Sequence, residues 1–577
     1  MIEKHYTALI ASLYVGLICV LPQIVFVISL GSAYRGIPLH QTPNEPAYLA
    51  IMHEITDGHP LVASFPYFEY KDTYPLLPPT LSFFYVAASI LFNIGLVSVL
   101  LASKFVFPAL LFFLSYLLIY RLEGEPEGWE GKLAAIAGGV LVTLGFDLVD
   151  YHLLQQIFQG IASPDNFLIW TRPLNPIGGA LLLFSFLLCI YSLIEKRERP
   201  RGRVVLAALF LALMISSYVF SWTLSLAVLG ILALFALFRR DWDEVKIFSV
   251  VGLLGSVLAL PYWYIVWSAS RLPDYAGASE RIGLLYTHAS VFNKFLLAVS
   301  LVFALSSYLA RQFPLWWKFA LALLLGSFIA YNQQVITGID IWHHHFVFYT
   351  IPLGYIVLML LLWHHLRPPF PRLFLVITSL VIAASLALGI FVQTAVYTKW
   401  APYYREFQGN AAVIEYLNKN APHDCVVLQN SNERLWATLV PAFTQCNLYV
   451  SREIELLIPR ERLLHNYFVF LRLRGITPDT LPAYLQAHTD EVYGYLRFQI
   501  DHRTDTQFAE LFARLPAEYR FFYGKDFRAE LRRYKLDYIL AVTPLSPPIL
   551  RELGNPKPLL TRGDITLYDF SVVVSSL

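Results

Sequence analysis

The sequence has few charged residues and no strong excess of either sign. Only 15% of its 577 residues are charged, whereas 57% are hydrophobic. A chain this poor in charge is not typical of a soluble protein and is typical of a polytopic membrane protein. With 43 Lys and Arg against 41 Asp and Glu, the net charge is +2, and no basic arm is present. This balance excludes nucleic acid as an expected partner.

The sequence also lacks two motifs that would point to specific chemistry. No glycine-rich phosphate loop follows a predicted strand, and no Cys/His spacing is typical of zinc. Cys19 and Cys189 lie within apolar segments, where packing accounts for them. Cys425 and Cys446 lie in the polar C-terminal part and are the only candidate disulfide pair. The sequence leaves open whether they are bonded.

Long apolar segments recur up to about Tyr397 and predict eleven membrane spans. The segments are 8–30, 98–120, 132–150, 176–194, 203–217, 219–238, 246–267, 289–308, 316–334, 345–364 and 373–396. The first of them lacks a small-residue cleavage pattern, so we expect a retained span. The stretch 79–96 is short and opens with LLPPT, and we expect it to lie at the outer interface. If it crosses, the chain has twelve spans.

Basic residues predict which loops are cytoplasmic, since Lys and Arg favour that side. The basic loops are 195–203, 239–246, 311–318 and 364–372, and an even number of predicted spans separates each from the next. Counting backwards places 121–131 on the same side, and the N-terminus joins them if 79–96 does not cross. The other connecting segments are then outside. They are the long loops 31–97, 151–175 and 268–288, the short loop 337–345, and the whole of 398–577. Polar chemistry is therefore expected on the outer face.

Few charged residues fall inside the predicted spans. Lys104, Asp147 and Asp150 are the exceptions, and each lies near an outer end. A transporter with a midplane site would more often carry charged residues in mid-span or paired broken helices. The pattern therefore disfavours a transporter or flippase.

After Lys399 the long apolar segments stop, and shorter segments that mix polar and apolar residues follow. An amphipathic helix ending at a proline precedes short apolar strands at 425–429, 447–450 and 565–570, and 528–542 reads as a helix followed by a strand. Strands that alternate with helices predict a small α/β domain. The predicted fold is thus an α-helical membrane domain (1–397) followed by an extracytoplasmic α/β domain (398–577). We expect this domain to act as a lid or acceptor-binding element, or as a structural cap.

The loop after the first span contains a clear helix signal. Asn44 can cap a helix, Pro46 suits its first turn, and Gly58 suits its end. The sequence predicts a short amphipathic helix over 45–57 that lies along the outer membrane surface.

Glu45 is at the N-terminal end of this predicted helix. The helix dipole favours an ionised carboxylate there. Such a group at the edge of a membrane cavity can remove a proton from an acceptor. The alternative is that Glu45 is only a helix-start charge.

Four stretches resemble the GT-C superfamily of membrane glycosyltransferases, which includes protein O-mannosyltransferases, aminoarabinose transferases and oligosaccharyltransferases. They are NEPAYLAIMHEITDGHPLV followed by PLLPP in the first outer loop, WTRPLNPIGG (170–179), NQQVITGIDIWHHHF (332–346) and LVPAFTQCNLYVSRE (439–453). The resemblance implies an inverting transfer of a sugar from a polyprenyl-phosphate donor on the outer face of the cytoplasmic membrane. Glu45 matches the position of the base, although many members carry Asp or an acidic pair where this chain has Asn44 and Glu45.

Four further residues are candidates for binding the donor phosphate. Arg172 stands at the outer start of a span, where a guanidinium can hold a phosphate by paired charge-assisted bonds. Its alternative role is snorkelling to the interface. Lys71, His344 and His345 are the other three.

Asp165 and His343 are weaker candidates, for acceptor or metal binding. Asp165 alternatively makes a turn. The His343–His345 run is a candidate for a divalent metal, but adjacent residues do not all face one ion, and the sequence identifies no cofactor. Arg271 and Arg281 either line the same mouth or flank a loop.

Two other functions compete with a glycosyltransferase. One is a non-catalytic GT-C-like assembly protein, and the other is a transporter or flippase of lipid-linked sugars. The sequence identifies neither the sugar nor the acceptor, which is a protein, a lipid or a glycan.

Overall fold

The chain folds into two compact units. The computed structural model describes residues 2–40, 42, 44–161, 163–195, 201–282, 284–309, 313–431, 434–451, 456–496 and 505–570. Unit 1 comprises 1–42, 88–263 and 286–406, and unit 2 comprises 43–87, 264–285 and 407–577. Unit 2 thus combines the C-terminal region with two segments that the sequence assigns to outer loops.

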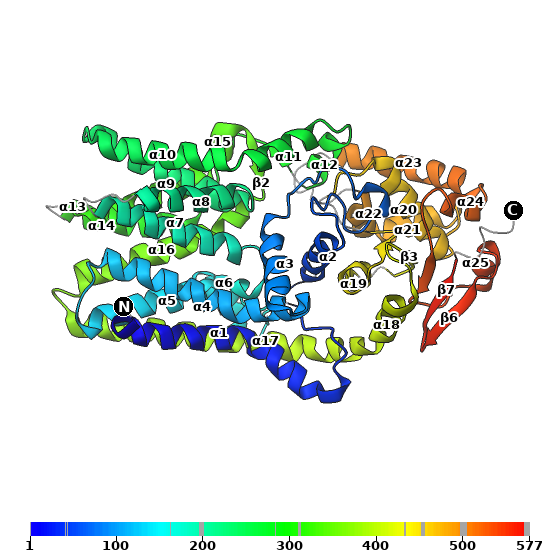
Figure 1. Ribbon diagram of the computed structural model, residues 1–577, viewed down its shortest axis with the longest axis horizontal. Coiled ribbons are helices and arrows are strands. Elements are labelled where there is room, and N and C mark those ends of the chain that lie inside the picture. Colours follow the sequence, from blue (N-terminus) through cyan, green and yellow to red (C-terminus); the bar gives the residue numbers. More distant parts are fainter. Residues whose placement is uncertain are drawn as a thin grey trace. The chain divides into compact units, whose positions relative to one another are not determined.

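Unit 1 is a bundle of helices that run side by side (Figure 1). Its principal helices are α1 (Ile2–Leu30), α4 (Leu96–Leu122), α5 (Trp129–Thr143), α7 (Ile177–Glu195), α8 (Arg201–Ile215), α9 (Val219–Phe238), α10 (Trp242–Leu258), α13 (Lys294–Leu309), α14 (Leu315–Tyr331), α16 (Val347–Leu361) and α17 (Pro371–Phe407). The shorter elements η4 (Ile169–Thr171), β2 (Ile339–Ile341) and η5 (His343–Phe346) lie just before α7 and α16. The helices α3 (Thr80–Phe92) and α11 (Leu260–Ser270) each contribute to both units.

Several of these helices are suited to a bilayer. Within the described residues, six helical stretches are long and apolar enough to cross a membrane, and a bent pair, α10 with α11, makes a seventh if it is one span. The chain is therefore an integral, multi-pass membrane protein. The structure places a helix in each of the eleven segments that the sequence predicts as spans.

The sequence predicts eleven spans, whereas six or seven helical stretches in the described residues are long enough to cross. The two counts differ because several of the helices are short. α5 and α8 have 15 residues each, α13 has 16 and α14 has 17, whereas a span typically needs ~20. The stretch 79–96 forms α3, a helix of 13 residues, which is likewise too short to cross alone. The eleven-span topology remains a prediction.

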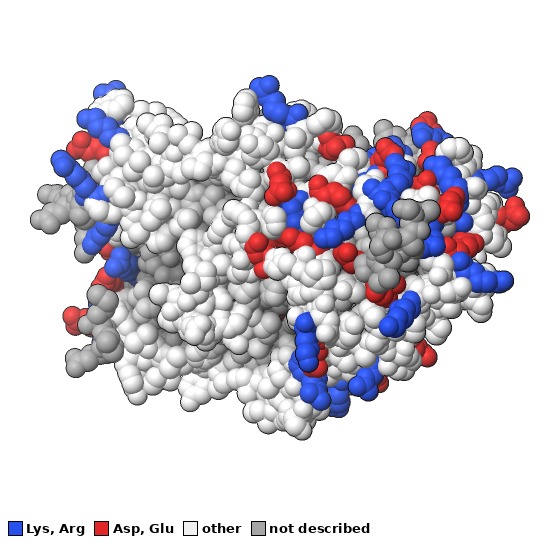
Figure 2. All heavy atoms as spheres, turned by 45° about the vertical axis from the view of Figure 1, so that its right-hand side comes forward, with Lys and Arg blue, Asp and Glu red and all other residues white. Residues whose placement is uncertain are grey.

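The basic loops gather at one end of unit 1. Lys4 pairs with Glu125 at 2.7 Å, and Arg367 pairs with Glu130 at 2.8 Å. Arg239 and Lys318 line the same small pocket. These contacts join the start of α1 to the loop after α4 and the segment after α16 to the start of α5, and they bring the segment after α9 to the start of α14. Figure 2 shows few charged side chains along the sides of these helices and a group of Lys and Arg at this end.

Unit 2 is built around a five-stranded mixed sheet. Its strands are β3 (Val426–Gln429), β4 (Asn447–Leu448), β5 (Tyr538–Ala541), β6 (Lys557–Arg562) and β7 (Ile565–Asp569). They are ordered β4-β3-β5-β7-β6, with β3 parallel to β4 and β5, and β7 antiparallel to β5 and β6. Every residue of β3 and β5 is buried, which explains the apolar runs 426–428 and 538–541.

Helices complete unit 2. They are α2 (Glu45–Thr56), α12 (Tyr275–Arg281), α18 (Ala411–Asn420), α19 (Arg434–Phe443), α20 (Arg460–Leu473), α21 (Leu481–Ala487), α22 (Thr489–Leu496), α23 (Asp505–Tyr523), α24 (Phe527–Leu531) and α25 (Pro547–Glu552). The helix α2 packs against α19. The first loop is therefore joined to the C-terminal part of the chain within one unit.

Candidate functional site

A cluster of polar and aromatic side chains lies at the end of unit 1 opposite the basic loops. Tyr218 directly precedes α9, Tyr331 ends α14, and His343–Phe346 directly precede α16. Arg172 follows η4 and precedes α7. The other ends of these helices lead to or come from the basic loops. The cluster is therefore at the opposite end of the bundle.

His345 is at the centre of this cluster. Its Nδ1 is hydrogen-bonded to the Tyr218 hydroxyl at 2.8 Å, and its ring centroid is 5.1 Å from that of Phe220. His344 is exposed, and its ring centroid is 4.6 Å from that of His345. Arg172 follows η4 at the same end of the bundle. The structure thus gathers three of the four predicted phosphate-binding residues.

His343 has a different environment from the two histidines that follow it. Its Nδ1 donates a hydrogen bond to Asp340 Oδ2 at 2.9 Å, and its ring centroid is 6.1 Å from that of Tyr331. Asp340 is only 3% exposed. Among the residues that the structure describes, no group of three or more His, Cys, Asp or Glu could hold a metal ion. The three histidines are therefore not arranged as a set of metal ligands.

The predicted helix at the start of the first loop is present in unit 2. It is α2, with Glu45 as its first residue and Pro46 in its first turn. Gly58 has φ +99°, a left-handed conformation that glycine adopts without strain. Asn44 precedes the helix, but its side chain makes no capping hydrogen bond.

Glu45 is fully buried, at 0% exposure. This differs from the expectation of a charge on a surface helix. Because α2 packs against α19, several of its side chains are enclosed, and Ala47, Ala50 and Met52 are buried with Glu45. The helix is a packed element of unit 2.

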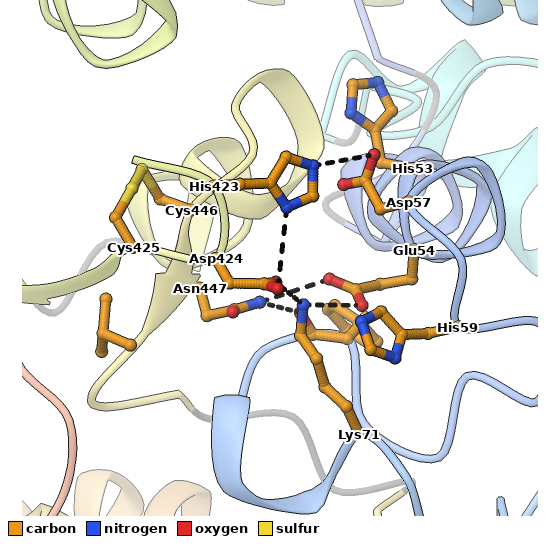
Figure 3. Close-up of polar contacts among 12 residues, drawn as sticks. His53, Glu54, Asp57, His59, Lys71, His423, Asp424, Cys425, Cys446 and Asn447 are labelled. Atoms are coloured by element: carbon orange, nitrogen blue, oxygen red, sulfur yellow. Dashed lines mark hydrogen bonds and ion pairs between the residues drawn. A yellow bond between two sulfur atoms is a disulfide. The ribbon is translucent and has the colours of Figure 1, made fainter. Parts of the chain in front are cut away.

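A buried ionic network attaches α2 to the sheet of unit 2 (Figure 3). Lys71 Nζ is 3.0 Å from Glu54 Oε2 and also pairs with Asp424 Oδ1. Asn447 Nδ2 donates a hydrogen bond to Glu54 Oε1 at 3.2 Å. Lys71 is 4% exposed and Glu54 5%. One ammonium therefore serves two carboxylates, and this geometry gives no support to the prediction that Lys71 binds a phosphate.

The disulfide forms next to this network. Cys425 is bonded to Cys446, which settles the question that the sequence leaves open. Asp424 and Asn447, which contact Lys71 and Glu54, directly precede and follow these two cysteines. The disulfide therefore fixes the two partners on the C-terminal side of the network.

Burial and charge act in opposite directions on the carboxyl groups of the network. Burial raises the pKa of Glu54 above its usual value, although the charge of Lys71 opposes the shift. Burial alone would also raise the pKa of Asp424, but its hydrogen bond to Lys71 and the charge of Lys71 lower it. Burial lowers the pKa of the nearby His53 imidazole. Asp424 is thus the firmer ionic partner of Lys71.

Two other predicted residues have local structural roles. Asp165 is exposed and pairs with Lys399, while its carbonyl accepts a hydrogen bond from the indole of Trp400 at 2.9 Å. Arg281 is buried and donates to the carbonyls of Leu456 and Ile458 at 3.0 and 3.1 Å. This contact orders the chain within unit 2, so Arg281 does not flank a loose loop.

Several residues of these sites have no clear sequence signal. Tyr218 and Tyr331 lie at helix ends, where an aromatic membrane belt is the default interpretation. Asp424 is 353 positions from Lys71, and no local pattern links them. Of these residues, only Asp340 could have been identified from the sequence, because it lies three residues before His343 in a loop predicted to be outside.

Fold and sites define a multi-pass membrane protein with a polar cluster at one end of its helical bundle and a helix-and-sheet unit that carries the first loop. No protein-family profile and no curated protein sequence matches the chain.

Solved structures match it over nearly its whole length. The structure of ArnT from Cupriavidus metallidurans bound to undecaprenyl phosphate has 12% sequence identity and a TM-score of 0.47, covering 98% of each chain. The oligosaccharyltransferase AglB from Archaeoglobus fulgidus, in complex with an inhibitory peptide and a dolichol-phosphate, has 12% identity and a TM-score of 0.46, covering 94% of this chain and 70% of that chain.

Proposed function

We propose that this protein is a glycosyltransferase that moves a sugar from a polyprenyl-phosphate donor to an acceptor at the outer face of the membrane. The observation that carries the proposal is that Arg172, His344 and His345 lie at the same end of the helical bundle. The sequence resemblance to GT-C enzymes supports the same reaction.

The composition of this cluster suits a lipid phosphate. A guanidinium binds phosphate oxygens through paired, charge-assisted hydrogen bonds. His344 and His345 add imidazole nitrogens that can donate hydrogen bonds, and the Tyr218 hydroxyl lies 2.8 Å from His345 Nδ1. The cluster lies where membrane-suited helices end, which is where the phosphate of a polyprenyl lipid would lie while its chain stays in the bilayer.

In the proposed reaction, an acceptor hydroxyl or amine attacks the anomeric carbon of the donor sugar. The bond between that carbon and the phosphate oxygen breaks, and its electron pair leaves with the polyprenyl phosphate. Arg172 stabilises the charge that develops on the phosphate. The acceptor proton passes to Glu45 as general base.

The test is the substitution Glu45→Gln, which keeps the size of the side chain and removes the base. We expect the rate of sugar transfer to fall by ~10²–10⁴-fold, the usual loss for a general base. Glu415→Gln is the matched control, because Glu415 is an exposed carboxylate on α18 in the same unit. Both variants are purified and compared with the wild type for thermal stability, donor binding and transfer.

Each outcome has a distinct meaning. Transfer by Glu45→Gln at the wild-type rate removes Glu45 from the mechanism. Donor binding without transfer by the wild type, across a panel of sugars and acceptors, favours the non-catalytic assembly protein.

A further inference from the structure

Two buried polar atoms beside the unit 1 cluster lack a hydrogen-bond partner among the described residues. They are Asp340 Oδ1, an acceptor, and the indole Nε1 of Trp342, a donor. The other Asp340 oxygen already accepts from His343 at 2.9 Å. Buried polar atoms are nearly always paired, so each such atom calls for an explanation.

The backbone at Trp342 adds an independent observation. Its φ is +44°, in the left-handed region that bulky side chains rarely adopt. Residues held in such conformations cluster at ligand-binding and active sites. Trp342 falls between β2, which contains Asp340, and η5, which contains the histidines. The unusual conformation therefore occurs between Asp340, which is hydrogen-bonded to His343, and the proposed phosphate-binding residues His344 and His345.

Both groups are adjacent to those residues. The ring centroid of Trp342 is 5.3 Å from that of His345, and the ring centroid of His343 is 6.0 Å from that of His344. The unmatched acceptor and donor thus border the cluster that contains His344 and His345. The group joined directly to the donor phosphate is the sugar.

We propose that Asp340 and Trp342 form the sugar-binding part of the donor site and bind a pyranose through its hydroxyl groups. This inference rests on the proposed function. A sugar hydroxyl donates to Asp340 Oδ1, and a hydroxyl oxygen accepts from Trp342 Nε1. A sugar supplies both partners at once because each hydroxyl is a donor and an acceptor. His343 positions Asp340 by occupying its other oxygen.

The experiment compares a lipid without a sugar and lipids with one. The first is undecaprenyl phosphate, and the others are the same lipid carrying glucose, mannose or galactose on the phosphate. Binding of each is measured to the wild type, Asp340→Asn, Trp342→Phe and Arg172→Ala. Asp340→Asn leaves one carboxamide oxygen where two carboxylate oxygens were available, and Trp342→Phe keeps a ring but removes the N–H. Trp129→Phe, at a tryptophan 63% exposed, is the control.

We expect Asp340→Asn and Trp342→Phe to weaken binding of a sugar-bearing lipid ~10-fold or more, the effect of leaving a buried polar group unpaired. Their binding of undecaprenyl phosphate should match the wild type, which also shows that they are folded. Arg172→Ala should weaken the binding of both kinds of lipid.

Equal losses for both lipids, or no loss in either variant, overturn the sugar-binding role and leave the phosphate site intact. Binding of undecaprenyl phosphate but of no sugar-bearing lipid by the wild type also overturns it. If the wild type binds neither lipid, the proposed function itself fails, and this inference fails with it.

Discussion

At the scale of single residues, substitutions of Arg172 distinguish two roles for this side chain: binding the donor phosphate, or lying at the membrane interface without a ligand. If it binds the donor phosphate, Arg172→Ala should weaken binding of undecaprenyl phosphate more than Arg172→Lys does. Lysine keeps the positive charge but loses the planar fork that makes two parallel bonds. We expect a ~10-fold or larger loss for alanine, since hydrogen bonds to charged groups contribute ~1.5–3 kcal/mol.

The matched control for this prediction is Arg372→Ala. Arg372 is exposed in the first turn of α17, at the end of unit 1 where the basic loops gather. Its loss should leave donor binding unchanged, because that end is opposite the polar cluster. Wild-type binding by both Arg172 variants would instead assign Arg172 to interfacial snorkelling.

The residue scale also shows what sequence can reveal about a site. The sequence points to Arg172, His344 and His345 because each combines a polar side chain with a span end on the predicted outer face, and their binding of a phosphate stays a prediction. The bond between Tyr218 and His345 could not be predicted, since its partners are 127 positions apart. The sequence suggests a phosphate for Lys71 because nothing in its loop indicates the pairing with Asp424. Pairings of this kind depend on tertiary packing alone.

At the scale of elements, the network around Lys71 connects α2 to the sheet. Lys71→Met would leave Glu54 and Asp424 without their shared cation. Removing one partner of a buried ion pair typically costs ~3–5 kcal/mol, because a buried charge is left uncompensated. Since Asp424 retains some exposure, we expect a value toward the lower end. The change should appear as a lower midpoint of thermal unfolding in detergent.

Two companion variants make this prediction specific to charge. Lys71→Arg keeps the cation and should lose much less stability. The triple variant Glu54→Gln, Lys71→Met, Asp424→Asn removes all three charges and should be more stable than Lys71→Met alone, because no unpaired charge remains. A Lys71→Met protein with an unchanged midpoint would show that the network contributes nothing to the attachment of α2.

Element boundaries were largely predictable where a local signal existed. The proline and glycine around α2, and the apolar runs of β3, β5 and β7, place these elements close to their observed positions. The strand β6 was missed because its sequence, KPLLTR, includes a proline and two basic residues. Its position at the sheet edge explains this composition, since proline and charge are tolerated on edge strands and not in central ones.

At the scale of the whole molecule, the chain does not divide at a single point. The sequence predicts a boundary near Lys399, but unit 2 also takes up 43–87 and 264–285. Composition could not reveal this, because both segments are loops between apolar runs and read as parts of the membrane domain. What joins them to unit 2 is long-range: the pairing of Lys71 with Asp424, and the hydrogen bonds of Arg281 to Leu456 and Ile458.

The sidedness of the chain is the last prediction. The basic loops and the start of α1 meet at one end of unit 1, and Lys and Arg favour the cytoplasmic side. The disulfide between Cys425 and Cys446 is typical of an extracytoplasmic compartment. We therefore expect the start of α1 in the cytoplasm and 398–577 outside.

A cysteine introduced at Thr480, which is exposed, tests this arrangement in intact cells with a membrane-impermeant maleimide. The background carries Cys19→Ser and Cys189→Ser, so that no free thiol competes. Thr480→Cys should be labelled from outside, whereas Arg372→Cys, in the basic end of unit 1, should be labelled only after the membrane is opened. Labelling of Thr480→Cys from the cytoplasm alone would reverse the topology. It would also place Glu45 on the wrong face for a donor that is used outside, because the network of Lys71 ties the first loop to the same unit as Thr480.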